Sequence, residues 1–238
     1  MAQTEQKNQN VKKQFEELQS LLERAMALQT SMVLFEWDDE TLAPKGAAEH
    51  TARVIGSLSE QYQEILASMR FKELLDVCQK AEKENAGVFD EVQSAILREA
   101  AEEQERLSCI PPEEYRAYAE LTARATGIWT RAREKNDFAS FAPVLKEIIS
   151  YQKKFAAYRA KPGQKLYDVM LDTYEKGFNM EMLDPFFELM KGKIVPLLKE
   201  SAERSKMVPD AFLSADYPEA AQAEAARFLA EYEGFDFD

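Results

Sequence analysis

Apolar side chains recur every three or four residues from Val11 to Phe35, and this spacing restricts the possible fold more than any other feature. The stripe consists of Val11, Phe15, Leu18, Leu22, Ala25, Leu28, Met32 and Phe35. Residues three and four apart share one face of an α-helix, so the spacing predicts a long helix that buries one face. The stretch Leu42-Ala43-Pro44-Lys45-Gly46 ends this helix, because a proline disfavours helical backbone at the residue before it.

The same spacing continues along the rest of the chain. It predicts further helices around residues 55–69, 71–85, 88–103, 112–132, 141–158, 167–174, 183–197 and 218–233. Ala86-Gly87, Gly177 and Gly234 are stop signals, and either Asp137 or Ser140 can begin the helix before residue 141. Because no segment alternates apolar and polar residues, no substantial sheet is expected.

These patterns predict an all-α fold, an array of about eight to nine helices with long antiparallel neighbours. The segment Lys161-Pro162-Gly163 gives only a weak boundary signal near residues 161–166. We therefore expect residues 1–238 to form a single helical region.

Charge and cysteine content exclude several classes of protein. The 43 acidic and 30 basic residues give a net charge of −13, which argues against binding to nucleic acid or to a membrane surface. The polar start MAQTEQKNQN indicates no signal peptide, and no apolar run approaches the ~20 residues of a membrane span. The two cysteines, Cys78 and Cys109, make no disulfide framework, so a cytoplasmic protein is expected.

The stretch FEWDDETLAPKGAAEHTAR has the composition of a catalytic or metal site, since it joins tryptophan, three acids and the only histidine, His50. Helical zinc sites use two histidines four residues apart with a third ligand, and di-iron bundles need Glu-x-x-His, where this chain has Ala47. Asp38, Asp39 and Glu40 are interpreted as acids at a helix end. The chain also has no phosphate-binding glycine loop. From the residues alone we therefore predict no catalytic and no metal-binding residue.

Three stretches in series nevertheless resemble a known family. The first is Trp37, Asp38, Thr41, Pro44, Gly46 and Arg53; the second is Trp129, Ala132, Asn136, Asp137, Phe138, Phe141, Pro143 and Leu145; the third is Tyr167, Asp168, Leu171, Asp172, Tyr174, Glu175 and Gly177. In this order and spacing they resemble the amino-terminal half of the carboxypeptidase Taq family, zinc metallocarboxypeptidases of broad specificity. Ala43 and Lys176 depart from the family, which favours methionine and proline there.

The resemblance implies that the full-length parent holds zinc through an HExxH helix in its other half and removes carboxyl-terminal residues from peptides. This chain would be the non-catalytic amino-terminal part, inactive alone, with the missing catalytic half as its partner and a homodimer as the common assembly. A stand-alone helical interaction module is the alternative.

The motif residues are expected to be structural. Trp37 and Trp129 would lie in the core, Asp38 and Asp172 would cap helices or form ion pairs, and Arg53 would pair with an acid such as Asp38. Apolar side chains between Tyr167 and Phe187 are expected to be exposed where the other half would pack.

Overall fold

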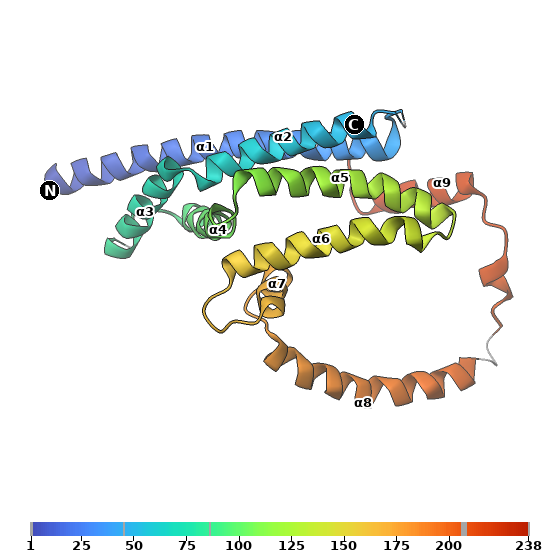
Figure 1. Cartoon of the computed structure of the whole chain (residues 1–238). Helices are drawn as coiled ribbons and strands as arrows, with labels where there is room; N and C mark the ends of the chain where they lie inside the picture. Colours follow the sequence, from blue (N-terminus) through green and yellow to red (C-terminus); the bar gives the residue numbers. More distant parts are fainter. Residues whose placement is uncertain (1, 45, 86, 206–208, 238) are drawn as a thin grey trace. The chain divides into compact units, whose positions relative to one another are not determined.

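The computed structural model describes residues 2–44, 46–85, 87–205 and 209–237 (Figure 1). Within these residues the chain forms nine α-helices and one 3₁₀-helix and contains no strand, which confirms the all-α prediction. The helices of the described part include none long and apolar enough to cross a membrane. Their backbone contacts divide the chain into two compact units, Met1–Gly177 and Phe178–Asp238.

The first unit contains seven helices among its described residues. They are α1 (Ala2–Thr41), α2 (Ala48–Ala67), α3 (Met69–Glu84), α4 (Glu91–Ser108), α5 (Pro112–Glu134), α6 (Phe138–Arg159) and α7 (Leu166–Tyr174). Helices α1 and α2 run side by side, as do α5 and α6 (Figure 1). The turn predicted at residues 42–46 and the stop signal predicted at residues 86–87 each include one residue, 45 or 86, that lies outside the described residues.

Side-chain caps account for several helix starts. Ser68 accepts a hydrogen bond from the backbone N–H of Phe71 at 3.2 Å. Asp90 and Gln93 form a reciprocal capping box, so α4 begins at Glu91 rather than near Val88 as predicted. Asp137 accepts a hydrogen bond from the backbone N–H of Ser140 at 3.2 Å, which makes Asp137 the cap of α6. Each cap satisfies an N–H group that has no partner inside the helix.

The core of the first unit is formed by side chains of α1, α2, α3 and α4 and of the segment before α4. Its fully buried large side chains include Phe15, Leu18, Leu66, Phe71, Leu74, Leu97 and Leu107. The rings of Phe15 and Phe89 lie 5.0 Å apart, although Phe89 precedes α4. Burying each such side chain contributes about 1.5–3 kcal/mol, so this cluster is the main source of stability.

Helices α2 and α5 approach closely at Gly56. A Cβ atom at this position would lie 2.3 Å from Cγ of Glu120, so only glycine fits without a shift of that side chain. Arg116 joins the two helices, because it lies 3.0 Å from Glu60 and 3.0 Å from Glu120. The close contact and the ion pairs fix the relative position of α2 and α5.

The second unit has no buried residue among those described. It consists of α8 (Met180–Ser205), the 3₁₀-helix η1 (Ala211–Ser214) and α9 (Glu219–Tyr232). Gly234 ends α9 with a φ of 85°, a conformation that favours glycine. Residues 161–166 lie inside the first unit, and the expected single helical region stays a prediction.

Candidate functional site

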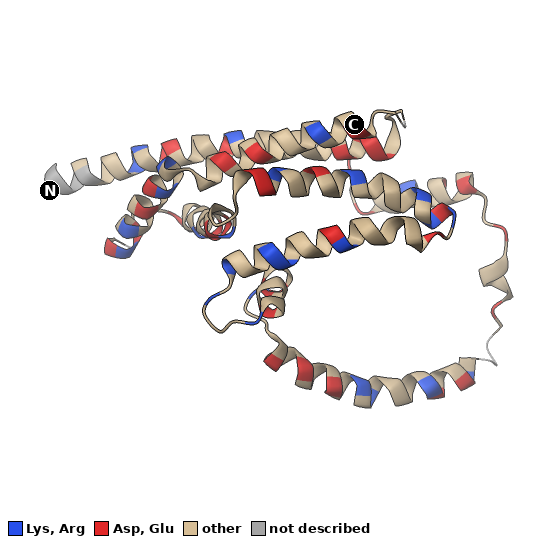
Figure 2. Ribbon diagram, viewed as in Figure 1, with Lys and Arg blue, Asp and Glu red and all other residues tan. Residues whose placement is uncertain are grey.

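A groove of about 1060 Å³ in the first unit is lined by residues from α4, the end of α6, α7 and the flanking loops. Its charged lining residues are Glu99, Glu102, Glu103, Glu105, Arg106, Arg159, Lys161, Asp172 and Lys176. Figure 2 shows charges of both signs along these helices rather than one basic surface. The groove is therefore polar and of mixed charge.

The third motif of the sequence lies at this groove. Asp172, in the last turn of α7, accepts a hydrogen bond from the backbone N–H of Gly177 at 2.8 Å, and its expected role as a cap or ion-pair partner stays a prediction. Gly177 has a φ of 79°, which requires glycine. Glu175 is the C-cap residue of α7, and Asp168 lies in its first turn. Tyr167 is 63% exposed, which suits neither a core nor a catalytic position.

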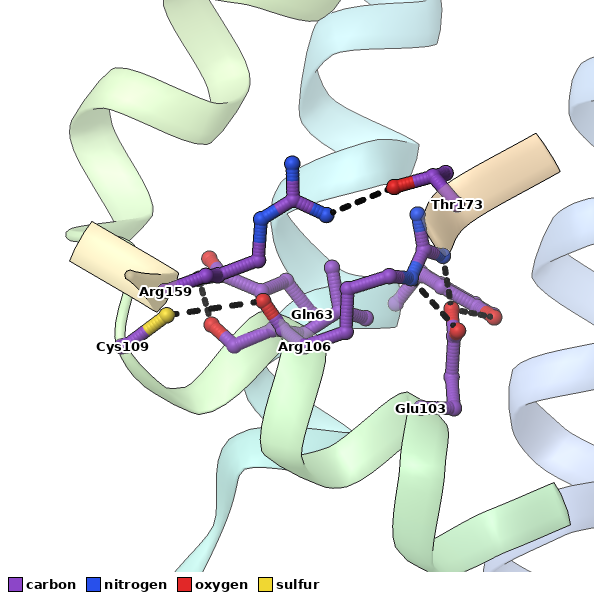
Figure 3. A network of polar contacts seen from close by, with 8 residues as sticks. Gln63, Glu103, Arg106, Cys109, Arg159 and Thr173 are labelled. Atoms are coloured by element: carbon purple, nitrogen blue, oxygen red, sulfur yellow. Dashed lines mark hydrogen bonds and ion pairs between the residues drawn. The ribbon is translucent and has the colours of Figure 1, made fainter. Parts of the chain in front are cut away.

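A network of polar contacts joins the lining helices (Figure 3). Glu103 accepts two hydrogen bonds from the guanidinium of Arg106, one of them from Nε at 2.8 Å, and a third from the hydroxyl of Tyr62 at 3.1 Å. Burial and then the Glu103 carboxylate raise the pKa of Tyr62, so this hydroxyl stays protonated. Burial acts to lower the pKa of Arg106, but the bonds to Glu103 outweigh it and the pKa is raised. Both groups are therefore structural rather than proton-transferring.

Lys176 forms an ion pair with Glu102 across the groove. This contact joins the end of α7 to α4 at a position where the resembling family favours proline. Where a proline would restrict the backbone of the turn, this chain has a lysine that makes a charged contact instead.

Arg159 is the other arginine of the groove, and its contacts are of a different kind. Its Nε donates to the carbonyl of Phe155 at 3.3 Å, and Nη1 donates to the hydroxyl of Thr173 at 3.2 Å. Nη2 contacts the sulfur of Met170 at 3.6 Å. Burial and the nearby charge of Arg106 lower the pKa of Arg159. Sequence reasoning missed this residue, since no motif or charge cluster marks it.

Neither cysteine has the environment of a nucleophile. Cys78 is buried, and burial raises its pKa to about 11. Cys109 lines the groove and is exposed, but burial of its sulfur raises its pKa as well. Its thiol donates to the carbonyl of Arg106 at 3.6 Å. Since the thiolate is the reactive form, both thiols are poor nucleophiles at neutral pH.

The first two motifs contradict the expectation that their tryptophans are buried. Trp37 is 55% exposed and Trp129 is 44% exposed. The guanidinium of Arg133 lies 5.3 Å from the centre of the Trp129 ring. Phe138, next to the cap Asp137, is 67% exposed. The two tryptophans are therefore less buried than the sequence analysis predicts.

Arg53 takes part in none of the ion pairs found among the described residues, so the expected pairing with an acid such as Asp38 is not seen there. Asp38 instead contributes its backbone carbonyl, which accepts hydrogen bonds from the N–H groups of Leu42 at 2.9 Å and Ala43 at 2.8 Å. The carbonyl of Pro44 then accepts from Ala47 at 2.8 Å, and Gly46 is exposed. The first motif thus forms the turn between α1 and α2.

A smaller depression of about 270 Å³ lies beside this turn. It is lined by Glu36, Asp39 and Glu40 of α1 together with threonines of α2 and α5. Burial and then the charge of Glu40 raise the pKa of Glu36. His50 is exposed and is not among the lining residues. Nowhere in the described part do three histidine, cysteine or acidic side chains come together in a way that could hold a metal ion.

The described residues thus form an all-α protein of long helices, with a turn motif between α1 and α2, a capped α6 and a polar groove beside α7. The family model described as carboxypeptidase Taq (M32) metallopeptidase matches residues 17–238. The chain belongs to this family.

Similar proteins are longer than this chain. Carboxypeptidase 1 of Bacillus subtilis is 32% identical over 218 residues, which are 92% of this chain and 42% of that protein. Thermostable carboxypeptidase 1 of Pyrococcus furiosus is 30% identical over 184 residues, 77% of this chain and 36% of that protein. The crystal structure of BsuCP superposes with a TM-score of 0.88 at 31% identity, over 95% of this chain and 44% of that one. The chain spans less than half the length of these relatives.

Proposed function

We propose that this chain is the amino-terminal, non-catalytic part of a zinc-dependent metallocarboxypeptidase that removes carboxyl-terminal residues from peptides. The observation that carries the proposal is the family match over residues 17–238, which corresponds to only 42% of the Bacillus subtilis relative. The role of this part is to form a wall and lid that limit which peptide ends reach the metal. The catalytic half is its partner.

The residues present here do not fit a zinc site. The 238 residues contain one histidine, whereas a zinc-binding HExxH segment needs two. In the part of the chain that the structure describes, acids and cysteines are not gathered around His50 either. We therefore assign zinc to the parent protein and derive no catalytic step from this chain.

Exposed apolar side chains support the proposed partner. Tyr167, Tyr174 and Phe187 are 63%, 78% and 52% exposed, as the sequence predicts for this region. Exposed apolar side chains on α7 and, separately, on α8 are of the kind found on surfaces that meet another protein part. We also propose that the family's homodimer forms in the parent and, since both cysteines are free, that the protein works in the reducing cytoplasm.

The test is a peptidase assay on the purified 238-residue chain, with amino-acid release from a blocked dipeptide as the readout and added Zn²⁺ as the metal source. We expect no release with or without a chelator. Release that the chelator abolishes would disprove the non-catalytic role. As a positive control, the same assay is run on a full-length relative from the family.

A stand-alone helical interaction module is the second candidate, favoured by the absence of any described buried residue in the second unit. The coding sequence after Asp238 separates the two candidates. An open frame that encodes HExxH supports the first, and a stop codon supports the second.

A further inference from the structure

Arg159 carries a positive charge that no carboxylate of the described residues neutralises directly. Its three hydrogen-bond partners, Phe155, Thr173 and Met170, are all uncharged. A guanidinium has five N–H donors, so two remain beyond these contacts. Figure 3 shows the Arg159 side chain directed at Thr173, whereas Arg106 is directed at Glu103.

Two other cations that line the groove are paired with acids of the chain. Arg106 is paired with Glu103, and Lys176 is paired with Glu102. Asp172 is near enough to interact with Arg159 electrostatically, but no ion pair within 4 Å joins them, and an oxygen of Asp172 accepts from Gly177. A half-buried guanidinium among neutral partners is energetically costly, and an anion in the groove would relieve that cost.

We propose that Arg159 is the anchor of a binding site for a small carboxylate in this groove. The planar guanidinium matches a carboxylate in two parallel hydrogen bonds. The groove also contains Glu102, Glu103, Glu105 and Asp172, whose charges repel a phosphate dianion more than a singly charged carboxylate. This proposal does not depend on whether the chain is part of a carboxypeptidase.

The volume of about 1060 Å³ exceeds that of acetate, so the carboxylate can belong to a free small acid or to the end of a peptide. The two sources share one chemistry and differ in size. Acetate and acetyl-Ala-Ala are therefore the two probes, and tighter binding of acetyl-Ala-Ala would assign the site to peptide ends. Equal binding would assign it to small acids.

The experiment follows the Nε–H resonance of Arg159 by NMR in the ¹⁵N-labelled 238-residue chain. Sodium acetate is titrated against sodium chloride at constant ionic strength, because screening alone shifts exposed charges. We expect a saturable shift with acetate and none with chloride. Equal shifts in both salts, or tighter binding of inorganic phosphate than of acetate, would overturn the proposal.

Variants test the residue itself, with backbone amide shifts of α7 as the readout. Arg159→Gln is expected to weaken acetate binding about tenfold or more, since it removes a charged hydrogen-bonding pair. Arg131→Gln, at an exposed arginine away from the groove, is the matched control and should bind as the parent chain does. Unchanged binding by Arg159→Gln contradicts the proposal.

Arg159→Gln also removes contacts between α6 and α7, so its fold is checked by circular dichroism. If it does not fold, Arg159→Lys decides. Lysine keeps the charge but loses the planar pair of donors, and several-fold weaker binding is expected. Binding by Arg159→Lys as tight as that of the parent chain would rule out a two-point carboxylate contact.

Discussion

Helices α1 and α8 carry similar apolar stripes but lie in very different surroundings. Three residues of the α1 stripe, Val11, Phe15 and Leu18, are 6%, 2% and 0% exposed. In α8, Phe187 is 52% and Leu197 is 61% exposed, and the helix has no buried residue. The stripe therefore predicts that a helix has an apolar face, but only a packed neighbour makes that face a core.

The same contrast occurs within α1. Its first half contributes Val11, Phe15 and Leu18 to the core, whereas Leu34 and Trp37 near its end are 61% and 55% exposed. In the proposed function, Phe187 of α8 belongs to the exposed apolar region that meets the catalytic half, and this chain spans less than half the length of its relatives.

The comparison is tested most strongly by a pair of phenylalanine truncations. Phe71 is 0% exposed, so Phe71→Ala should lower the free energy of unfolding by about 3–5 kcal/mol. Phe187→Ala should change it by less than about 0.5 kcal/mol, because the side chain is half exposed. Urea denaturation followed by circular dichroism measures both. A large loss of unfolding free energy in Phe187→Ala would mean that this face of α8 is buried in solution. That result would contradict the proposal that the face is free.

Two glycines give a second pair, with effects of opposite sign. At Gly56 the new methyl group would lie 2.3 Å from Cγ of Glu120, which is itself held by Arg116. Gly56→Ala should therefore destabilise the first unit by about 1–3 kcal/mol. At Gly192 in α8 nothing lies within 4 Å, so Gly192→Ala should favour the helix by about 0.5–1 kcal/mol.

Thermal unfolding and helical content by circular dichroism measure this pair. Removing the obstacle gives the control: Glu120→Ala combined with Gly56→Ala should cost less than the sum of the single changes, since the methyl group then has space. Additive costs would show that the close approach of α2 and α5 does not cause the loss at Gly56.

Local features of the sequence predicted the fold well. The turn at Pro44, the cap at Asp137 and the stop at Gly177 each depend on a few neighbouring residues, and each is where the sequence placed it. Burial was predicted less well, since Trp37 and Trp129 are exposed. Burial depends on what packs on a helix from elsewhere, which local periodicity does not contain.

The groove could not be predicted at all beyond the third motif. Arg106, Arg159 and Lys176 come from three separate elements, α4, α6 and the turn after α7. Nothing in their spacing along the sequence brings them together. Of these three residues, the sequence analysis singled out only Lys176, as a departure from the family. In the structure Lys176 forms an ion pair with Glu102.

The smallest expected effect concerns a partly buried acid of the first unit. Burial, and then Glu40, raise the pKa of Glu36 above its ordinary value. For a carboxyl group whose pKa is raised on folding, the stabilising contribution is present at acidic pH and is lost as pH rises through the folded pKa. Glu36→Gln removes this loss and should raise the free energy of unfolding at pH 7 by a few tenths of a kcal/mol, since solvent screens the site.

The pH dependence distinguishes this cause from a general effect of removing one negative charge. Near pH 3 the Glu36 carboxyl is protonated in both the folded and the unfolded chain, so Glu36→Gln should give no gain there. Glu23→Gln removes an equal charge from an exposed position in the middle of the same helix and serves as the matched control. Denaturant titrations at both pH values measure the two variants. An equal gain from both at pH 7 would assign the effect to net charge, and the depression beside the turn between α1 and α2 would then have no part in it.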